Sequence, residues 1–265
     1  MIDTHAHLNF KDFKNDYQEV ITRSFDNGVT AIINVGSNFE TSKRTCEMAK
    51  EFEDKKIKIF STIGLHPTKV GKEIFQPEKY KEVAKKYRAY VKAVGETGLD
   101  YFHLKNKEDQ EKQKQIFRKH LQLARELNLP LVLHCRGEAN AIEKPYFEIL
   151  EILSHFERTI GMVHCFSVDW QVAKEFLKRG FYLGFNGVIT FPNFKYKEVV
   201  EKTPLEKILL ETDCPYLAPQ AVRGTRNEPK NLFYIAKEMA KIKNEPMTKI
   251  IKTTDQNAQK FFNLI

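Results

Sequence analysis

Short apolar runs rich in β-branched residues alternate with longer amphipathic stretches along the chain, and this alternation constrains the fold more than any other feature. Each run has the length of one buried strand, and the stretches between them show the apolar spacing of helices. Helices are expected at residues 108–127, 143–156, 231–242 and 247–262. Eight strands are expected, at residues 1–4, 29–35, 57–64, 90–95, 130–134, 160–164, 181–185 and 207–211.

Strands that alternate with helices pair in parallel through right-handed crossovers. Eight strand–helix units in 265 residues are typical of a (β/α)₈ TIM barrel, an α/β fold. A doubly wound open sheet is the alternative, but no glycine-rich phosphate loop opens an early helix. Because no linker or composition shift divides the chain, we expect residues 1–265 to form a single domain.

The composition excludes several classes of protein. Hydrophobic residues make up 42% and charged residues 29%, a balance that argues against intrinsic disorder. No apolar stretch approaches the roughly 18 residues of a membrane-spanning helix, and the first residues lack the pattern of a secretory signal. The four cysteines form no CxxC pair, which argues against a zinc finger or a disulfide framework. We therefore expect a soluble, cytoplasmic protein with no membrane partner and no stable protein partner.

The chain is basic. It has 43 Lys and Arg against 35 Asp and Glu, a formal net charge of +8. A positive field of this size favours anionic partners such as nucleic acid or phosphorylated metabolites. A lysine-rich solvated surface, with neighbours such as Lys55 and Lys56, explains the same charge equally well.

Ionisable residues stand where the apolar runs end. In an extended chain His5 and His7 point to the same face, so they can chelate one ion. The pattern recurs at other strand ends, with His66, Glu96, His134, His164 and Asp213. Carboxyl ends of barrel strands carry the chemistry of barrel enzymes. Five of the eight histidines lie there; structural or surface roles are expected for the other three, His103, His120 and His155.

Four of these histidines and two carboxylates make a metal site with nitrogen and oxygen ligands. Six ligands are too many for one tetrahedral ion and suit two divalent ions that share a bridging carboxylate, for which Glu96 is the natural choice. Zinc, manganese and magnesium all accept such ligands. One ion would take His5, His7 and Asp213, and the other would take His134 and His164. If these side chains point inward, the neighbouring Cys135, Cys165 and Cys214 point outward, where a thiol acts as a small apolar group.

Seven segments in this order resemble the TatD family of metal-dependent deoxyribonucleases, a branch of the amidohydrolase-like superfamily. They are residues 3–7, 64–67, 95–101, 134–136, 164–167, 211–219 and 223–229. The resemblance implies DNA as substrate and cleavage of single strands or ends from 3′ to 5′. It places the metal ligands on His5, His7, Glu96, His134, His164 and Asp213. The departures from the family pattern are Gly137, Val168 and Cys214, none of which is a proposed ligand.

Catalytic and substrate-binding roles follow as hypotheses. Glu96 would bridge the ions, and Asp213 would orient the attacking water and accept its proton, or act as a ligand alone. His66 could donate a hydrogen bond to the substrate or orient a ligand. Guanidinium groups match phosphate oxygens and aromatic rings stack on bases, so the further predicted substrate contacts are Arg136, Arg223, Arg226 and Tyr101. For Arg226 the alternative is capping the helix that follows, and for Tyr101 it is packing within a loop.

Two other functions remain open. The chain could hydrolyse another ester or amide, as an aminoacyl-tRNA deacylase does. It could also be a non-catalytic nucleic-acid-binding protein with structural metals, although structural zinc sites are usually closed and rich in cysteine.

Overall fold

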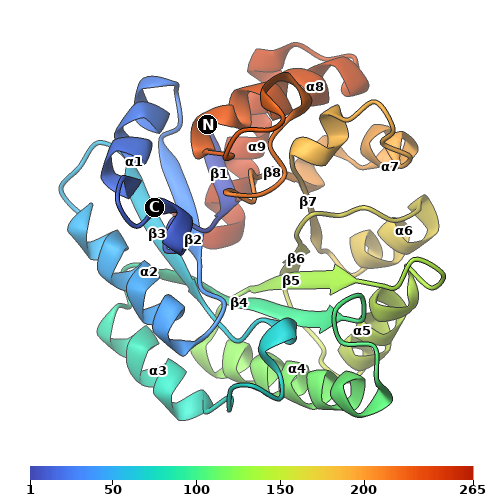
Figure 1. Ribbon diagram of the computed structural model, residues 1–265. Coiled ribbons are helices and arrows are strands. Elements are labelled where there is room, and N and C mark those ends of the chain that lie inside the picture. Colours follow the sequence, from blue (N-terminus) through green and yellow to red (C-terminus); the bar gives the residue numbers. More distant parts are fainter. Residues whose placement is uncertain (265) are drawn as a thin grey trace.

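A computed structural model describes residues 1–264 and confirms the barrel. Eight parallel strands pair in sequence order, and the helices lie outside the ring that they form (Figure 1). The strands are β1 (Ile2–Ala6), β2 (Ala31–Val35), β3 (Lys58–Ile63), β4 (Val91–Asp100), β5 (Leu131–Arg136), β6 (Gly161–Val163), β7 (Tyr182–Phe185) and β8 (Ile208–Leu210).

Hydrogen bonds between the end of β1 and the segment that follows β8 close the ring. Ala6 pairs in parallel with Cys214. The His7 amide donates to the Cys214 carbonyl at 2.9 Å, and the Asp213 amide donates to the His5 carbonyl at 2.8 Å. Because these bonds lie at the carboxyl ends of the strands, closure itself brings Asp213 beside the two histidines at the end of β1.

Helices follow the strands around the outside of the barrel. They are α1 (Tyr17–Asp26), α2 (Phe39–Glu51), α3 (Pro77–Lys86), α4 (Lys107–Leu127), α5 (Lys144–Ser154), α6 (Trp170–Lys178), α7 (Lys197–Lys202), α8 (Leu232–Lys243) and α9 (Met247–Phe262). Side chains cap several of them: Asn38, Asn106 and Asp169 accept hydrogen bonds from backbone amides in the first turns of α2, α4 and α6. Within residues 1–264, no helix is both long and apolar enough to cross a membrane.

The last helix covers the amino end of the barrel. Asp255 of α9 accepts a hydrogen bond from the amide of Ile2, the first residue of β1. Phe261 and Phe262 pack in one buried cluster with interior residues such as Val132 and Leu209. The helix α9 therefore covers the amino end of the barrel, and the ionisable side chains lie at the opposite, carboxyl end.

Most strand boundaries differ from the expected ones by one or two residues, and the largest difference is at the end of β4. β4 continues to Asp100, whereas its end was expected at residue 95, because residues 97–100 pair with residues 133–136 of β5. A Cβ at Gly98, whose φ is +134°, would collide with the carbonyl of His134, so glycine permits this close pairing. β6 ends at Val163, so His164 follows the strand and is not its last residue.

An ion-pair cluster ties the loop after β8 to α1. Arg226 donates to both carboxylate oxygens of Asp16, at 2.9 and 2.6 Å, and to Glu228 at 3.0 Å. Arg23 of α1 bonds the same Glu228 at 2.7 Å. The Arg226 guanidinium also lies 4.5 Å from the centre of the buried Phe13 ring. Arg226 therefore joins two distant segments of the chain, which is a structural role.

We predict that Arg226→Gln lowers the free energy of unfolding by about 1–2 kcal/mol at pH 7, because charged hydrogen bonds to two carboxylates are lost. Hydrogen bonding to Arg226 lowers the pKa of Asp16 from its usual 3.8. A lowered carboxyl pKa stabilises the fold above the unfolded value, and this stabilisation is lost as the pH falls through the folded value. The difference between wild type and variant should therefore shrink below about pH 4. Urea denaturation at pH 7 and pH 3.5 measures both effects.

Arg136→Gln is the control for this prediction, because Arg136 is exposed and has no carboxylate partner within residues 1–264. Equal losses of stability in the two variants would contradict the structural role of Arg226.

Candidate metal centre

The predicted ligands from the first and last strands meet around Glu96 of β4. One carboxylate oxygen, Oε2, lies 3.6 Å from His5 Nε2 and 3.7 Å from His7 Nε2. Asp213 approaches the same two nitrogens, with its Oδ1 3.8 Å from His5 Nε2 and 3.5 Å from His7 Nε2. Glu96 and Asp213 thus share two imidazoles, although 117 positions separate them in the chain.

The other oxygen of Glu96 faces a second group of imidazoles. Glu96 Oε1 lies 2.9 Å from His134 Nδ1, 2.8 Å from His164 Nε2 and 3.4 Å from His66 Nε2. The structure therefore brings together all six predicted ligands. Glu96 divides its two oxygens between the same two groups that the sequence predicted for the two ions.

Hydrogen bonds from behind orient several rings toward this centre. His7 Nδ1 lies 3.1 Å from the Val35 carbonyl and donates to it, so its Nε2 lone pair faces Glu96. His134 Nε2 lies 3.0 Å from Asp100 Oδ2, and its Nδ1 faces inward. His164 Nδ1 lies 3.5 Å from Glu211 Oε1, an ionic contact and not a hydrogen bond. Carboxylates and carbonyls in such positions commonly fix the rings of metal-binding histidines.

The centre is buried and stabilises positive charge. Burial alone would raise the pKa of Glu96, but the imidazoles of His66, His164 and His5 hold it well below its usual 4.5. Burial would likewise lower the pKa of His164, yet Glu96 and Glu211 raise it well above 6.5. The pKa of Asp213 is also lowered, because its bond to His7 and the nearby imidazoles outweigh its burial. Both carboxylates are therefore anionic at neutral pH, and cations are favoured between the rings.

The donor geometry fits divalent ions. His5 Nε2 and His7 Nε2 are 3.2 Å apart, and so are His134 Nδ1 and His164 Nε2. Two nitrogens that each lie about 2.0–2.1 Å from one ion are separated by about this distance. Ligand atoms of His5, His7 and Glu96 lie within 4.8 Å of one another, as do those of His66, Glu96 and His134. The residues present therefore suit one ion on each side of Glu96.

His66 differs from the other imidazoles. Its Nδ1 accepts a hydrogen bond from the Thr68 amide at 3.2 Å. A neutral ring in this position carries its proton on Nε2, the atom that faces Glu96. This tautomer suits the predicted role of hydrogen-bond donor better than the role of ligand.

Two of the predicted substrate-binding arginines are exposed beyond the carboxyl ends of the strands. The Arg136 guanidinium lies 4.2 Å from the centre of the Phe102 ring, and that of Arg223 lies 4.1 Å from the centre of the Phe191 ring. Neither has a carboxylate partner in the part of the chain that the structure describes. Both charges are therefore available to an anion.

The structure places two other predicted substrate contacts elsewhere. Tyr101 is only 1% exposed, and its hydroxyl donates to Glu148, so its ring cannot stack on a base. Arg226 is engaged by the ion-pair cluster with Asp16 and Glu228. Neither residue is kept as a substrate contact. In both cases the side chain is bonded to a carboxylate that is distant in the sequence.

Sequence reasoning missed two carboxylates. Asp100 and Glu211 are fully buried and lie behind His134 and His164. His103 is half exposed, with its Nδ1 2.9 Å from Asp100 Oδ2, which agrees with the structural or surface role expected for it. Both carboxylates follow apolar strand residues in the sequence, a signal that could have identified them.

Most other expectations for His and Cys agree with the structure. His120 is buried and accepts a hydrogen bond from the Leu65 amide at 3.0 Å, a structural role. Cys135 and Cys214 are buried in apolar clusters, as expected for thiols that point away from the centre. Cys165 is an exception, because it lies beyond β6 with φ at +49° and does not follow the alternation of a strand.

Comparisons with known proteins agree with this geometry. A family model described as TatD related DNase matches residues 2–263. The chain is 38% identical to the uncharacterized metal-dependent hydrolase YabD of Bacillus subtilis, covering 100% of this chain and 99% of YabD. It is 33% identical to a Methanocaldococcus jannaschii protein that also carries the description of an uncharacterized metal-dependent hydrolase, over 98% of this chain and 96% of the relative.

Solved structures show the same architecture. The crystal structure of YJJV, a TatD homologue from Escherichia coli, superposes with a TM-score of 0.87 at 29% identity, covering 100% of this chain and 98% of YJJV. A guanine deaminase from C. acetobutylicum, at 12% identity and a TM-score of 0.65, shares the fold alone. The family match over nearly all of the sequence and the close relatives lead to one conclusion: this chain belongs to the TatD family of metal-dependent hydrolases.

Proposed function

We propose that this hydrolase is a two-metal deoxyribonuclease that cleaves phosphodiester bonds of DNA. The observation that carries the proposal is the division of Glu96 between two groups of imidazoles, with Asp213 beside one of them. A pair of cations is the usual means of hydrolysing a phosphodiester, whose negative charge repels an attacking hydroxide. Cleavage of single strands or ends from 3′ to 5′ is part of the proposal and rests on the resemblance to the family.

The ions would be held on the two sides of Glu96. His5, His7 and Asp213 would hold one, and His134 and His164 the other, with zinc, manganese or magnesium compatible with these donors. When bound, such ions lower the pKa of water and neutralise charge on phosphoryl oxygens. Asp100 holds the ring of His134 in place by a hydrogen bond from behind, and the Glu211 carboxylate faces Nδ1 of His164 at 3.5 Å.

Asp213 is the proposed proton acceptor. Its side chain is 13% exposed, against 3% for Glu96, so it is the carboxylate that water and substrate reach more easily. Its lowered pKa keeps it ionised at neutral pH, as a base must be. In the proposed step Asp213 takes one proton from the attacking water, whose oxygen forms the new bond to phosphorus while the bond to the leaving oxygen breaks.

Arg136, Arg223 and His66 would position the phosphate group. The two guanidinium groups are exposed and can each make paired hydrogen bonds to phosphate oxygens. The Nε2 proton of His66 faces the centre and can be donated in a hydrogen bond to the substrate. These contacts select a phosphodiester over an uncharged ester, and the net charge of +8 favours a polyanion.

We predict that Asp213→Asn lowers kcat for a labelled single-stranded DNA by about 100- to 10,000-fold, because the proton acceptor is lost. Release of nucleotides in the presence of Mn²⁺ measures kcat and KM. Glu175→Gln, a change at an exposed residue of α6, is the matched control and should leave both constants unchanged.

Deacylation of aminoacyl-tRNA without release of nucleotides from DNA would replace this proposal by the alternative hydrolase. DNA cleavage at the wild-type rate by Asp213→Asn would remove Asp213 from the proposed mechanism.

We also predict that Mn²⁺ or Zn²⁺ at a hundredfold excess over its dissociation constant stabilises the wild-type protein by about 2.7 kcal/mol for each bound ion, and so by about 5.4 kcal/mol for two ions. For a chain of this size the expected rise in Tm is about 10–20 °C. Glu96→Ala removes both bridging oxygens and should lose most of this rise. Differential scanning calorimetry with and without EDTA measures it, and an equal rise in the variant would show that the ions bind elsewhere.

A further inference from the structure

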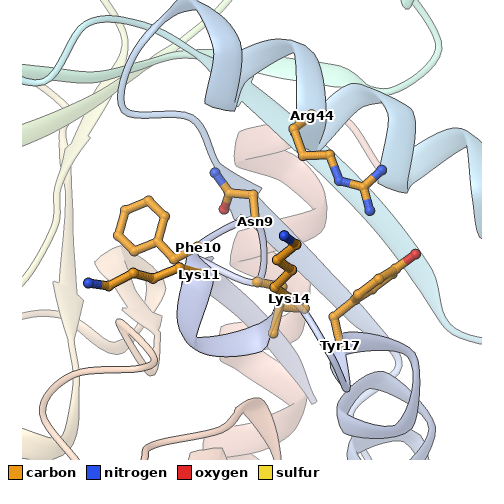
Figure 2. A pocket seen from close by; sticks show the side chains of 7 residues that line it. Asn9, Phe10, Lys11, Lys14, Tyr17 and Arg44 are labelled. Atoms are coloured by element: carbon orange, nitrogen blue, oxygen red, sulfur yellow. The ribbon is translucent and has the colours of Figure 1, made fainter.

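A basic pocket lies beside the metal centre, in the segment that follows β1. Its volume is about 130 Å³, several times the roughly 30 Å³ that a water molecule occupies in the liquid, so a phosphate-sized group has room there. Figure 2 shows Phe10 and Lys11 on one side, Tyr17 and Arg44 on the other, and Asn9 and Lys14 between them. The lining contains three cationic side chains and no carboxylate.

The positive charge of this pocket is largely uncompensated. Lys11 and Lys14 form no ion pair with any residue in the described range 1–264. Arg44 has one weak contact, 3.9 Å from Glu47 Oε2, and lies over the Tyr17 ring. The Tyr17 hydroxyl donates to Glu51, which leaves the ring of Tyr17 as part of the wall. Apart from the weak contact of Arg44 with Glu47, these cationic side chains have no ion-pair partner within residues 1–264, and a lining of this kind favours an anionic ligand.

Direct contacts connect the pocket to the metal centre. The Phe10 ring stacks on the predicted ligand His7, with 4.4 Å between ring centroids. Asn9 Nδ2 donates to the Val35 carbonyl at 3.2 Å, the same carbonyl that accepts from His7 Nδ1. Phe10 lines the pocket and stacks on His7, so the pocket borders the metal centre on the side of His7.

We propose that this pocket is a subsite for a backbone phosphate of the nucleic-acid strand whose neighbouring phosphodiester lies at the metal centre. The proposal rests on the proposed function for the identity of the strand. Lys14 and Arg44 bind the phosphate oxygens, Lys11 adds to the local positive potential, and the exposed part of Phe10 packs against the nucleoside between the two phosphates.

A binding experiment tests the subsite without requiring catalysis. Fluorescence anisotropy with a labelled single-stranded phosphorothioate decamer, which keeps the charge of each phosphate and slows cleavage, compares wild type with the double variant K14Q/R44Q in the presence of Mn²⁺. The loss of one phosphate contact should weaken binding about five- to tenfold at about 50 mM salt. It should also make the slope of log K against log salt shallower by about 0.7.

The matched control is K55Q/K56Q, which removes the same charge at the other end of the barrel. Lys55 and Lys56 are exposed and precede β3, so they lie at the amino ends of the strands. This variant should change the affinity less than twofold. Equal weakening by the two double variants would show that net charge, and not the pocket, determines binding, and would overturn the proposal.

A second arm locates the contact. In a series of decamers, each with one uncharged methylphosphonate in place of a phosphate, one position should weaken binding to wild type and have no further effect on K14Q/R44Q. If the loss of affinity caused by the methylphosphonate and the loss caused by K14Q/R44Q add at every position, the pocket holds no phosphate.

The subsite and the proposed function can fail separately. If wild type binds through the pocket but does not cleave DNA with Mn²⁺, the subsite stands and the proposed nuclease function fails. If it cleaves DNA and K14Q/R44Q binds normally, the subsite fails alone.

Discussion

The buried carboxylate of Glu96 determines how the rest of the centre is arranged. An anion in a site that is nearly closed to solvent is costly unless positive charge surrounds it. Here five imidazoles, from the end of β1, from β5 and from the segments after β3 and β6, turn a nitrogen toward its two oxygens. These rings come from four different parts of the barrel. The position of Glu96 thus depends on the closure of the whole sheet, and the chemistry of the centre depends on Glu96.

The apolar packing that stabilises the barrel and the ionisable residues of the metal centre lie at opposite ends of the strands. The amino end of the barrel is covered by α9, and the apolar side chains of the interior fill the space above it. At the carboxyl end the ionisable residues of the centre lie at the end of β1, within β4 and β5, and in the segments that follow β3, β6 and β8. Two buried carboxylates lie behind the rings, Asp100 in a hydrogen bond to His134 and Glu211 facing His164 at 3.5 Å. Such carboxylates cost desolvation but fix which nitrogen of a ring faces the centre.

The sequence predicted the parts of the site that follow from the position of a residue in a strand. His5, His7 and Glu96 could be found because an ionisable side chain at the end of a buried strand is costly unless a ligand or a partner compensates it. Arg226 and Tyr101 could not be placed in this way, since their roles depend on Asp16 and Glu148, which meet them only in the folded chain. For the same reason the basic pocket was missed, because its cationic side chains come together only when α2 packs beside the segment after β1.

The proposed chemistry requires that six side chains hold a pair of divalent ions with Glu96 between them. Elemental analysis of the protein, dialysed after saturation with Zn²⁺ or Mn²⁺, counts these ions. We expect two ions for each wild-type chain and a loss of at least one in Glu96→Ala. A single ion per wild-type chain, or two ions retained by the variant, would be incompatible with a centre bridged by Glu96.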